Sequence, residues 1–133
     1  MTMIWPTLVT LAALALYFWM SLAVARARVK YKVPAPAMSG NPDFERVFRV
    51  QLNTLEWMPI FLPALWLCAF YVDARVAAGL GLVWIVGRIM FMHGYIATPD
   101  KRHAGFLVQG IAAFLLWIGA LSGVVWSVWQ TGF

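Results

Sequence analysis

Charged and polar side chains recur at a regular spacing between residues 46 and 56. Arg46, Arg49, Asn53 and Glu56 follow one another at intervals of three, four and three residues. Because an α-helix turns about 100° per residue, this spacing places the four side chains on one stripe of a helix. Such a stripe either binds a charged ligand or pairs with itself as a salt-bridge ladder. In the ladder interpretation Arg49 and Glu56 are too far apart to pair directly, and Asn53 lies between them.

Gln51 belongs to the same segment but to a different face of the helix. It lies about 200° from Arg49 around the helix axis, so one helix cannot direct both side chains at the same ligand. If both residues bind, Gln51 must serve a pocket formed with another helix or another subunit.

A second stripe follows later in the chain, where Arg88, Phe91 and Tyr95 are spaced three and four residues apart. Arg88 lies about two helical turns inside an apolar segment. A charge at that depth is costly, so its guanidinium must face protein or water. Its partner is either a ligand or a structural acceptor, and Glu56 and the carbonyls near Pro59 are the candidates for the latter.

The elements that must position these groups are membrane-spanning helices. Hydrophobic residues make up 63% of the 133 residues and charged residues only 11%, and the mean hydropathy is +0.79. The apolar runs approach the roughly 20 residues that a helix needs to cross a bilayer. We therefore expect an all-α integral membrane four-helix bundle, formed by one domain over residues 1–133, with spans at about 3–27, 43–71, 75–97 and 103–130.

Local signals support the start of the second span and the identity of the first span. Asn41 or Asp43 can cap the second helix, and Pro42 suits its first turn. A secretory signal peptide is the alternative for the first segment, but its apolar run is too long and no basic residue precedes it.

The distribution of basic residues predicts the orientation. Nine of the ten Lys and Arg residues lie on the side shared by the first and third connections, and Arg75 alone lies opposite. By the positive-inside rule that side is cytoplasmic, which leaves both chain termini non-cytoplasmic. Cations that converge on one face of the membrane favour an anionic ligand. Nucleic acid is not an expected partner, because these bases flank apolar spans, and two histidines with the single Cys68 are too few ligands for a closed zinc site.

Several motifs together identify a family. Residues 44–56 carry Phe-Glu-Arg-Val-x-Arg-x-Gln-x-Asn-x-x-Glu, and Pro59 begins Pro-x-Phe-Leu. Gly87-Arg88, Gly94-Tyr95 and Lys101-Arg102-x-x-Gly-Phe follow. Over essentially its whole length the chain resembles the MAPEG family, the membrane-associated proteins of eicosanoid and glutathione metabolism, and in particular its short bacterial glutathione transferases.

The resemblance implies a fold, a cosubstrate and a place. It implies a homotrimer in the bacterial inner membrane, surrounded by membrane lipids, with glutathione bound between adjacent subunits near the cytoplasmic face and no metal. The implied activity is that of a glutathione transferase, whose glutathione thiolate attacks a lipophilic electrophile or reduces a lipid hydroperoxide. Arg102 is the implied catalytic residue, which stabilises the thiolate. The implied glutathione-binding residues are Arg28, Arg49, Gln51, Asn53, Glu56, Arg88 and Tyr95, with Arg28 and Gln51 reaching the ligand from the neighbouring chain.

The chain also departs from the family pattern. Trp57 and Phe91 stand where tyrosines are often found, and Val29 replaces a second arginine of the first helix. A lipid-binding scaffold of the same fold that does not use glutathione is the alternative function. The joint presence of the implied binding residues and Arg102 argues against it. A proton-coupled transporter would require carboxylates in mid-membrane, for which Glu56 alone is a weak case.

Overall fold

The computed structural model describes residues 2–132, and this part of the chain forms four long helices. They are α1 (Ile4–Tyr31), α2 (Pro42–Tyr71), α3 (Ala74–Ala97) and α4 (His103–Thr131), with the short 3-10 helix η1 (Pro99–Arg102) directly before α4. Each helix boundary lies within one residue of the expected range except the end of α1, which continues from residue 27 to Tyr31. Residues 1 and 133 of the expected domain lie outside the described part.

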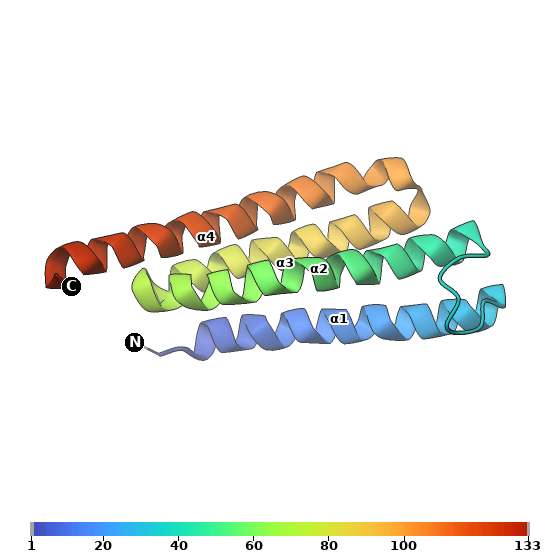
Figure 1. Ribbon diagram of the computed structural model, residues 1–133, viewed down its shortest axis with the longest axis horizontal. Coiled ribbons are helices and arrows are strands. Elements are labelled where there is room, and N and C mark those ends of the chain that lie inside the picture. The colour runs from blue at the N-terminus through green and yellow to red at the C-terminus, as the bar shows by residue number, and fades with distance from the viewer. Residues whose placement is uncertain (1, 133) are drawn as a thin grey trace.

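The helices run antiparallel and side by side (Figure 1). Both ends of the chain lie at one end of the bundle, and the α1–α2 linker lies with η1 at the other. α2 and α3 pack against each other, α1 packs on one side of this pair, and α4 packs on the other. Each of these helices is long and apolar enough to cross a membrane. The expected all-helical, four-span architecture is thereby confirmed.

Side-chain caps begin the two central helices. The Asn41 Oδ1 accepts hydrogen bonds from the backbone N–H groups of Asp43 and Phe44 at 2.9 and 3.2 Å. Asp73 caps α3 in the same way, through bonds from Arg75 N and Val76 N. These bonds satisfy N–H groups that have no partner in the first helical turn. They fix where α2 and α3 enter the bundle, and hence the register of the side chains that follow.

Glycines let α3 and α4 approach closely. A Cβ atom on Gly105 would lie 2.2 Å from the Phe91 backbone nitrogen, and one on Gly87 would lie 2.5 Å from that of Gln109. No larger residue fits without moving a helix, which is the small-residue packing typical of membrane helices. The close contact holds the C-terminal half of α3 directly against the start of α4.

Much of the surface of α1 is exposed in the described part of the chain. One row of its exposed apolar residues recurs at alternating steps of four and three: Ile4, Leu8, Leu11, Ala15, Phe18, Leu22, Ala25 and Val29. We call this row the heptad face of α1. An apolar repeat of this period is typical of a helix that packs along another helix.

Candidate functional site

The expected polar residues meet at the end of the bundle that carries the linker and η1. There, α2, α3 and the start of α4 enclose a cavity of about 400 Å³, which we call the polar pocket. It is lined by Arg49, Asn53, Phe91, Tyr95, Arg102, His103 and Phe106. Four of the eight residues implied by the family resemblance therefore line one cavity within a single chain.

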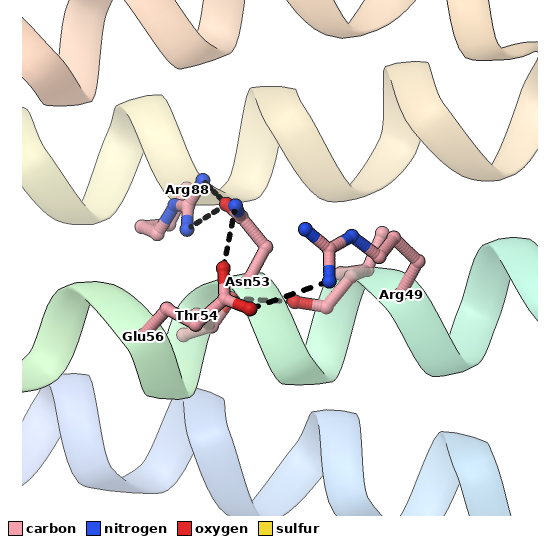
Figure 2. Close-up of polar contacts among 6 residues, drawn as sticks. Arg49, Asn53, Thr54, Glu56 and Arg88 are labelled. Carbon is pink, nitrogen blue, oxygen red and sulfur yellow. Dashed lines mark hydrogen bonds and ion pairs between the residues drawn. The ribbon is translucent and has the colours of Figure 1, made fainter.

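The stripe on α2 forms a network beside this pocket (Figure 2). Arg49 Nη1 donates to Glu56 Oε1 at 3.3 Å, and Asn53 Nδ2 donates to Glu56 Oε2 at 3.4 Å. The expectation that Arg49 and Glu56 are too far apart to pair was wrong. Their positions are separated by two turns, about 10 Å along the axis, but both side chains are long and half exposed and extend toward each other. The ladder and the pocket are thus one structure, since Arg49 belongs to both.

Arg88 lies beneath the pocket instead of lining it. Its side chain is 0% exposed, and its Nη1 and Nη2 both donate to Asn53 Oδ1 at 2.9 Å. The guanidinium carbon lies 4.4 Å from the centre of the Phe91 ring, within cation–π range. The structural partner of Arg88 is therefore Asn53, and neither Glu56 nor a carbonyl near Pro59.

Arg102 stands at the mouth of the pocket. Its Nη1 donates to the Pro99 carbonyl at 3.1 Å, and its guanidinium carbon lies 5.8 Å from the Tyr95 ring centre. The Tyr95 ring in turn stacks on Phe91 at 5.5 Å. The Pro99 carbonyl and the Tyr95 ring orient the Arg102 guanidinium and occupy only part of its donor capacity. Other N–H donors of this cation can therefore bind a ligand.

Gln51 and Arg28 do not join the polar pocket. Gln51 Nε2 donates to Ser21 Oγ on α1 at 2.9 Å, so it lies on the opposite side of α2 from Arg49. Arg28 Nη1 donates to the Ala37 carbonyl at 2.7 Å, and its guanidinium carbon lies 4.9 Å from the Phe44 ring centre. Within one chain, Arg28 holds the α1–α2 linker against α2.

Arg46 has a structural role as well. It forms an ion pair with Asp43, and its Nε donates to the Ile96 carbonyl at 3.0 Å. The first member of the α2 stripe thus ties α2 to the end of α3.

His103 and Phe106 also line the pocket, although neither is among the site residues predicted from the sequence. His103 directly follows Arg102, and Phe106 belongs to the motif that begins at Lys101. That adjacency was the available signal. Which way the first turn of α4 faces depends on its packing against α3, and the spacing along the chain does not determine this.

An apolar groove adjoins the polar pocket. It has a volume of about 330 Å³ and is lined by Trp57, Ile60, Gly110, Ala113, Phe114 and Trp117. Trp57 packs edge-on against Phe106, with ring centres 5.6 Å apart and planes at 84°. Since Phe106 lines the pocket and Trp57 lines the groove, this aromatic pair forms the wall between them.

Four helices long and apolar enough to cross a membrane indicate an integral membrane protein, and the cationic pocket lies at one end of the bundle. The MAPEG family model matches residues 6–122, and the chain belongs to the MAPEG family. The identification made from the motifs is confirmed.

The chain is also similar to individual proteins. The chain is 47% identical over 128 residues to an uncharacterized protein of Synechocystis sp., covering 96% of this chain and 93% of that protein. It is 44% identical over 104 residues to human microsomal glutathione S-transferase 2, covering 77% and 71%. It is 37% identical over 117 residues to the leukotriene C4 synthase of Cavia porcellus, covering 88% and 78%. The chain is therefore similar over most of its length to membrane proteins of glutathione-related transfer chemistry.

Proposed function

We propose that the protein is a membrane glutathione transferase that ionises the thiol of glutathione and directs the thiolate at lipophilic electrophiles. The observation that carries this proposal is the polar pocket, in which Arg49, Asn53, Tyr95 and Arg102 line one cavity of about 400 Å³. No acidic residue is among its described lining residues, so the pocket attracts anions. The similarity to human microsomal glutathione S-transferase 2 supports glutathione as that anion.

The groups around the pocket match those of glutathione, which carries two carboxylates and one amine. Arg49 uses Nη1 for Glu56, and the rest of its fork is free to bind a ligand carboxylate. Glu56 is half exposed and suits the ligand amine. Asn53 and Tyr95 add hydrogen-bonding groups between these ends. Ligand binding would thus add a carboxylate to Arg49 and an amine to Glu56 while their own pair persists, which limits the cost of desolvating Arg49.

Arg102 is the residue that makes the bound thiol reactive. A free thiol has a pKa near 8.5, and each unit by which a neighbouring cation lowers that pKa corresponds to about 1.4 kcal/mol. The thiol proton leaves to water at the open mouth of the pocket. The sulfur electron pair then forms a bond to the electrophilic carbon, whose leaving group departs with its bonding electrons. Reduction of a lipid hydroperoxide begins with the same thiolate.

The apolar groove is the proposed site for the electrophile. None of its described lining residues is charged, and Ile60, Phe114 and Trp117 expose about half of their surface. A lipophilic molecule would therefore enter from the bilayer and would reach the sulfur past Trp57 and Phe106.

A homotrimer completes the proposal. The heptad face of α1 has no partner within the described chain, and its period suits packing along another helix. Gln51 and Arg28 lie on this α1 side, away from the pocket of their own chain. In a trimer they are the residues positioned to reach the pocket of a neighbour. The nine cations at the linker end support a cytoplasmic pocket, with both termini across the bacterial inner membrane.

The direct test is calorimetric titration of glutathione into the purified, detergent-solubilised protein, together with turnover of a chlorodinitrobenzene at pH 7. We expect saturable binding and conjugation. Arg75→Ala is the control, because it removes one charge from the opposite end of the bundle. A folded protein that binds lipid but not glutathione would instead be a lipid-binding scaffold.

A further inference from the structure

Arg88 is a fully buried arginine whose two terminal nitrogens both donate to one oxygen atom, Asn53 Oδ1. Figure 2 shows its guanidinium extending from α3 to meet the Asn53 side chain on α2. It does not line the polar pocket, and Asn53 does. A ligand in the pocket would therefore meet Asn53 and not Arg88.

The arginine determines which way the Asn53 amide points. A guanidinium can only donate hydrogen bonds, and an ionised carboxylate can only accept them. Asn53 lies between the two, so its oxygen must face Arg88 and its NH₂ group must face Glu56, as the 3.4 Å contact from Nδ2 to Oε2 shows. The reversed amide would bring two donors together on one side and two acceptors on the other.

The effect reaches the edge of the pocket. One Glu56 oxygen accepts from Asn53, and the other accepts from Arg49. Four side chains thus form a continuous path from the buried interior of α3 to the pocket: Arg88, Asn53, Glu56 and Arg49.

An arginine suits this position better than other donors. Its planar fork places two N–H groups on one oxygen, and Phe91 covers one guanidinium face at 4.4 Å. These contacts offset part of the cost of a buried charge. A lysine at this position would supply a point charge without the fork.

We propose that Arg88 is a positioning residue: it orients the Asn53 amide and, through it, holds the Glu56 carboxylate where that carboxylate binds the ligand amine. The inference rests on the proposed glutathione site. It assigns Arg88 an indirect role in place of the direct ligand contact that the family resemblance implies.

A double-mutant cycle tests the coupling, with Arg88→Met as the buried change and Glu56→Ala as the exposed one. We expect each single variant to bind glutathione roughly 10-fold more weakly. The double variant should also bind roughly 10-fold more weakly, because Arg88 acts through the group already removed. Losses that multiply to roughly 100-fold would overturn the proposal.

A second measurement separates positioning from packing. The wild-type protein should prefer glutathione over its analogue without the α-amino group, and Arg88→Met should lose most of this preference. A merely structural role would weaken both ligands equally, which would contradict the proposal. Arg88→Lys should restore part of the preference, and it replaces Arg88→Met in the cycle if that variant does not fold in detergent. If the wild-type protein itself binds no glutathione, the proposed function fails and this inference fails with it.

Discussion

The two sides of α2 differ in the polar contacts that their side chains make within one chain. On the side facing α3 and α4, Arg49, Asn53 and Glu56 form a continuous hydrogen-bonded path to Arg88. On the side facing α1, Gln51 makes a single bond to Ser21. The outer surface of α1, which includes the heptad face, is exposed. One chain therefore forms a cationic pocket on one side of α2, whereas on the other side the apolar heptad face of α1 stays exposed in the described part of the chain.

The largest effect is expected on the side of α2 that lines the polar pocket. Arg49→Ala removes both the Glu56 pair and a donor to a ligand carboxylate, so glutathione binding should weaken by about 1.5 to 3 kcal/mol. Isothermal calorimetry measures this. Arg75→Ala, the control at the far end of α3, should bind glutathione like the wild-type protein. If Arg49→Ala bound glutathione with wild-type affinity, the α2 stripe would have only the structural role of a salt-bridge ladder.

The second prediction separates binding from chemistry on the same side. Arg102→Ala should leave glutathione affinity nearly unchanged, because other groups hold the carboxylates. It should raise the pKa of the bound thiol by about one to two units and lower turnover at pH 7 by roughly 10- to 100-fold. Part of the activity should return at higher pH, where the thiol ionises without help. Thiolate absorbance in the ultraviolet, titrated against pH, reads the ionisation directly. An unchanged thiol pKa with unchanged turnover would remove Arg102 from the mechanism.

These contrasts also show what a sequence can predict. Apolar runs and the cap at Asn41 were sufficient to predict most of the helix boundaries, because both act locally. The end of α1 was the exception. The apolar run ends before Arg26, but basic residues are good helix formers and interact favourably with a helix C-terminus, so the helix continues to Tyr31.

The site was predictable in part for the same reason. Helical periodicity placed Arg49 and Asn53 on one stripe, and both line the pocket. The partner of Arg88 was not predictable, because its choice among acceptors depends on the distance between α2 and α3. His103 was not predicted as a pocket residue, because the direction in which the first turn of α4 points depends on how α3 and α4 pack at Gly87 and Gly105.

The third prediction sharpens the division between the polar pocket and the apolar groove. A Cβ on Gly110 would meet nothing within 4 Å, so a leucine there would extend into the groove without disturbing the fold. Gly110→Leu should raise KM for a long-chain electrophile by roughly 10-fold, consistent with about 1.4 kcal/mol of lost apolar contact. Glutathione affinity should not change.

Gly79→Leu is the matched control for this change. A Cβ added at Gly79 would also meet nothing within 4 Å, but Gly79 lies on α3, outside the groove. Steady-state kinetics with a long-chain electrophile and a small one should show a selective loss in Gly110→Leu only. Equal effects of the two leucines would show that the groove does not hold the electrophile.

The smallest effect is expected on the side of α2 that faces α1. Gln51→Ala removes the bond to Ser21 and, in the proposed trimer, a contact to the neighbouring pocket. It should weaken glutathione binding by about 0.5 to 1.5 kcal/mol, the usual value of one neutral hydrogen bond. Ser21→Ala removes the same intrachain bond but leaves the Gln51 amide in place, so it should affect affinity less. Native mass measurement in mild detergent should show three chains for each protein. If Ser21→Ala and Gln51→Ala weaken binding equally, Gln51 acts only within its own chain. A wild-type monomer that binds glutathione at full stoichiometry would exclude any contribution from the α1 side, and the asymmetry between the two faces of α2 would then reflect lipid contact alone.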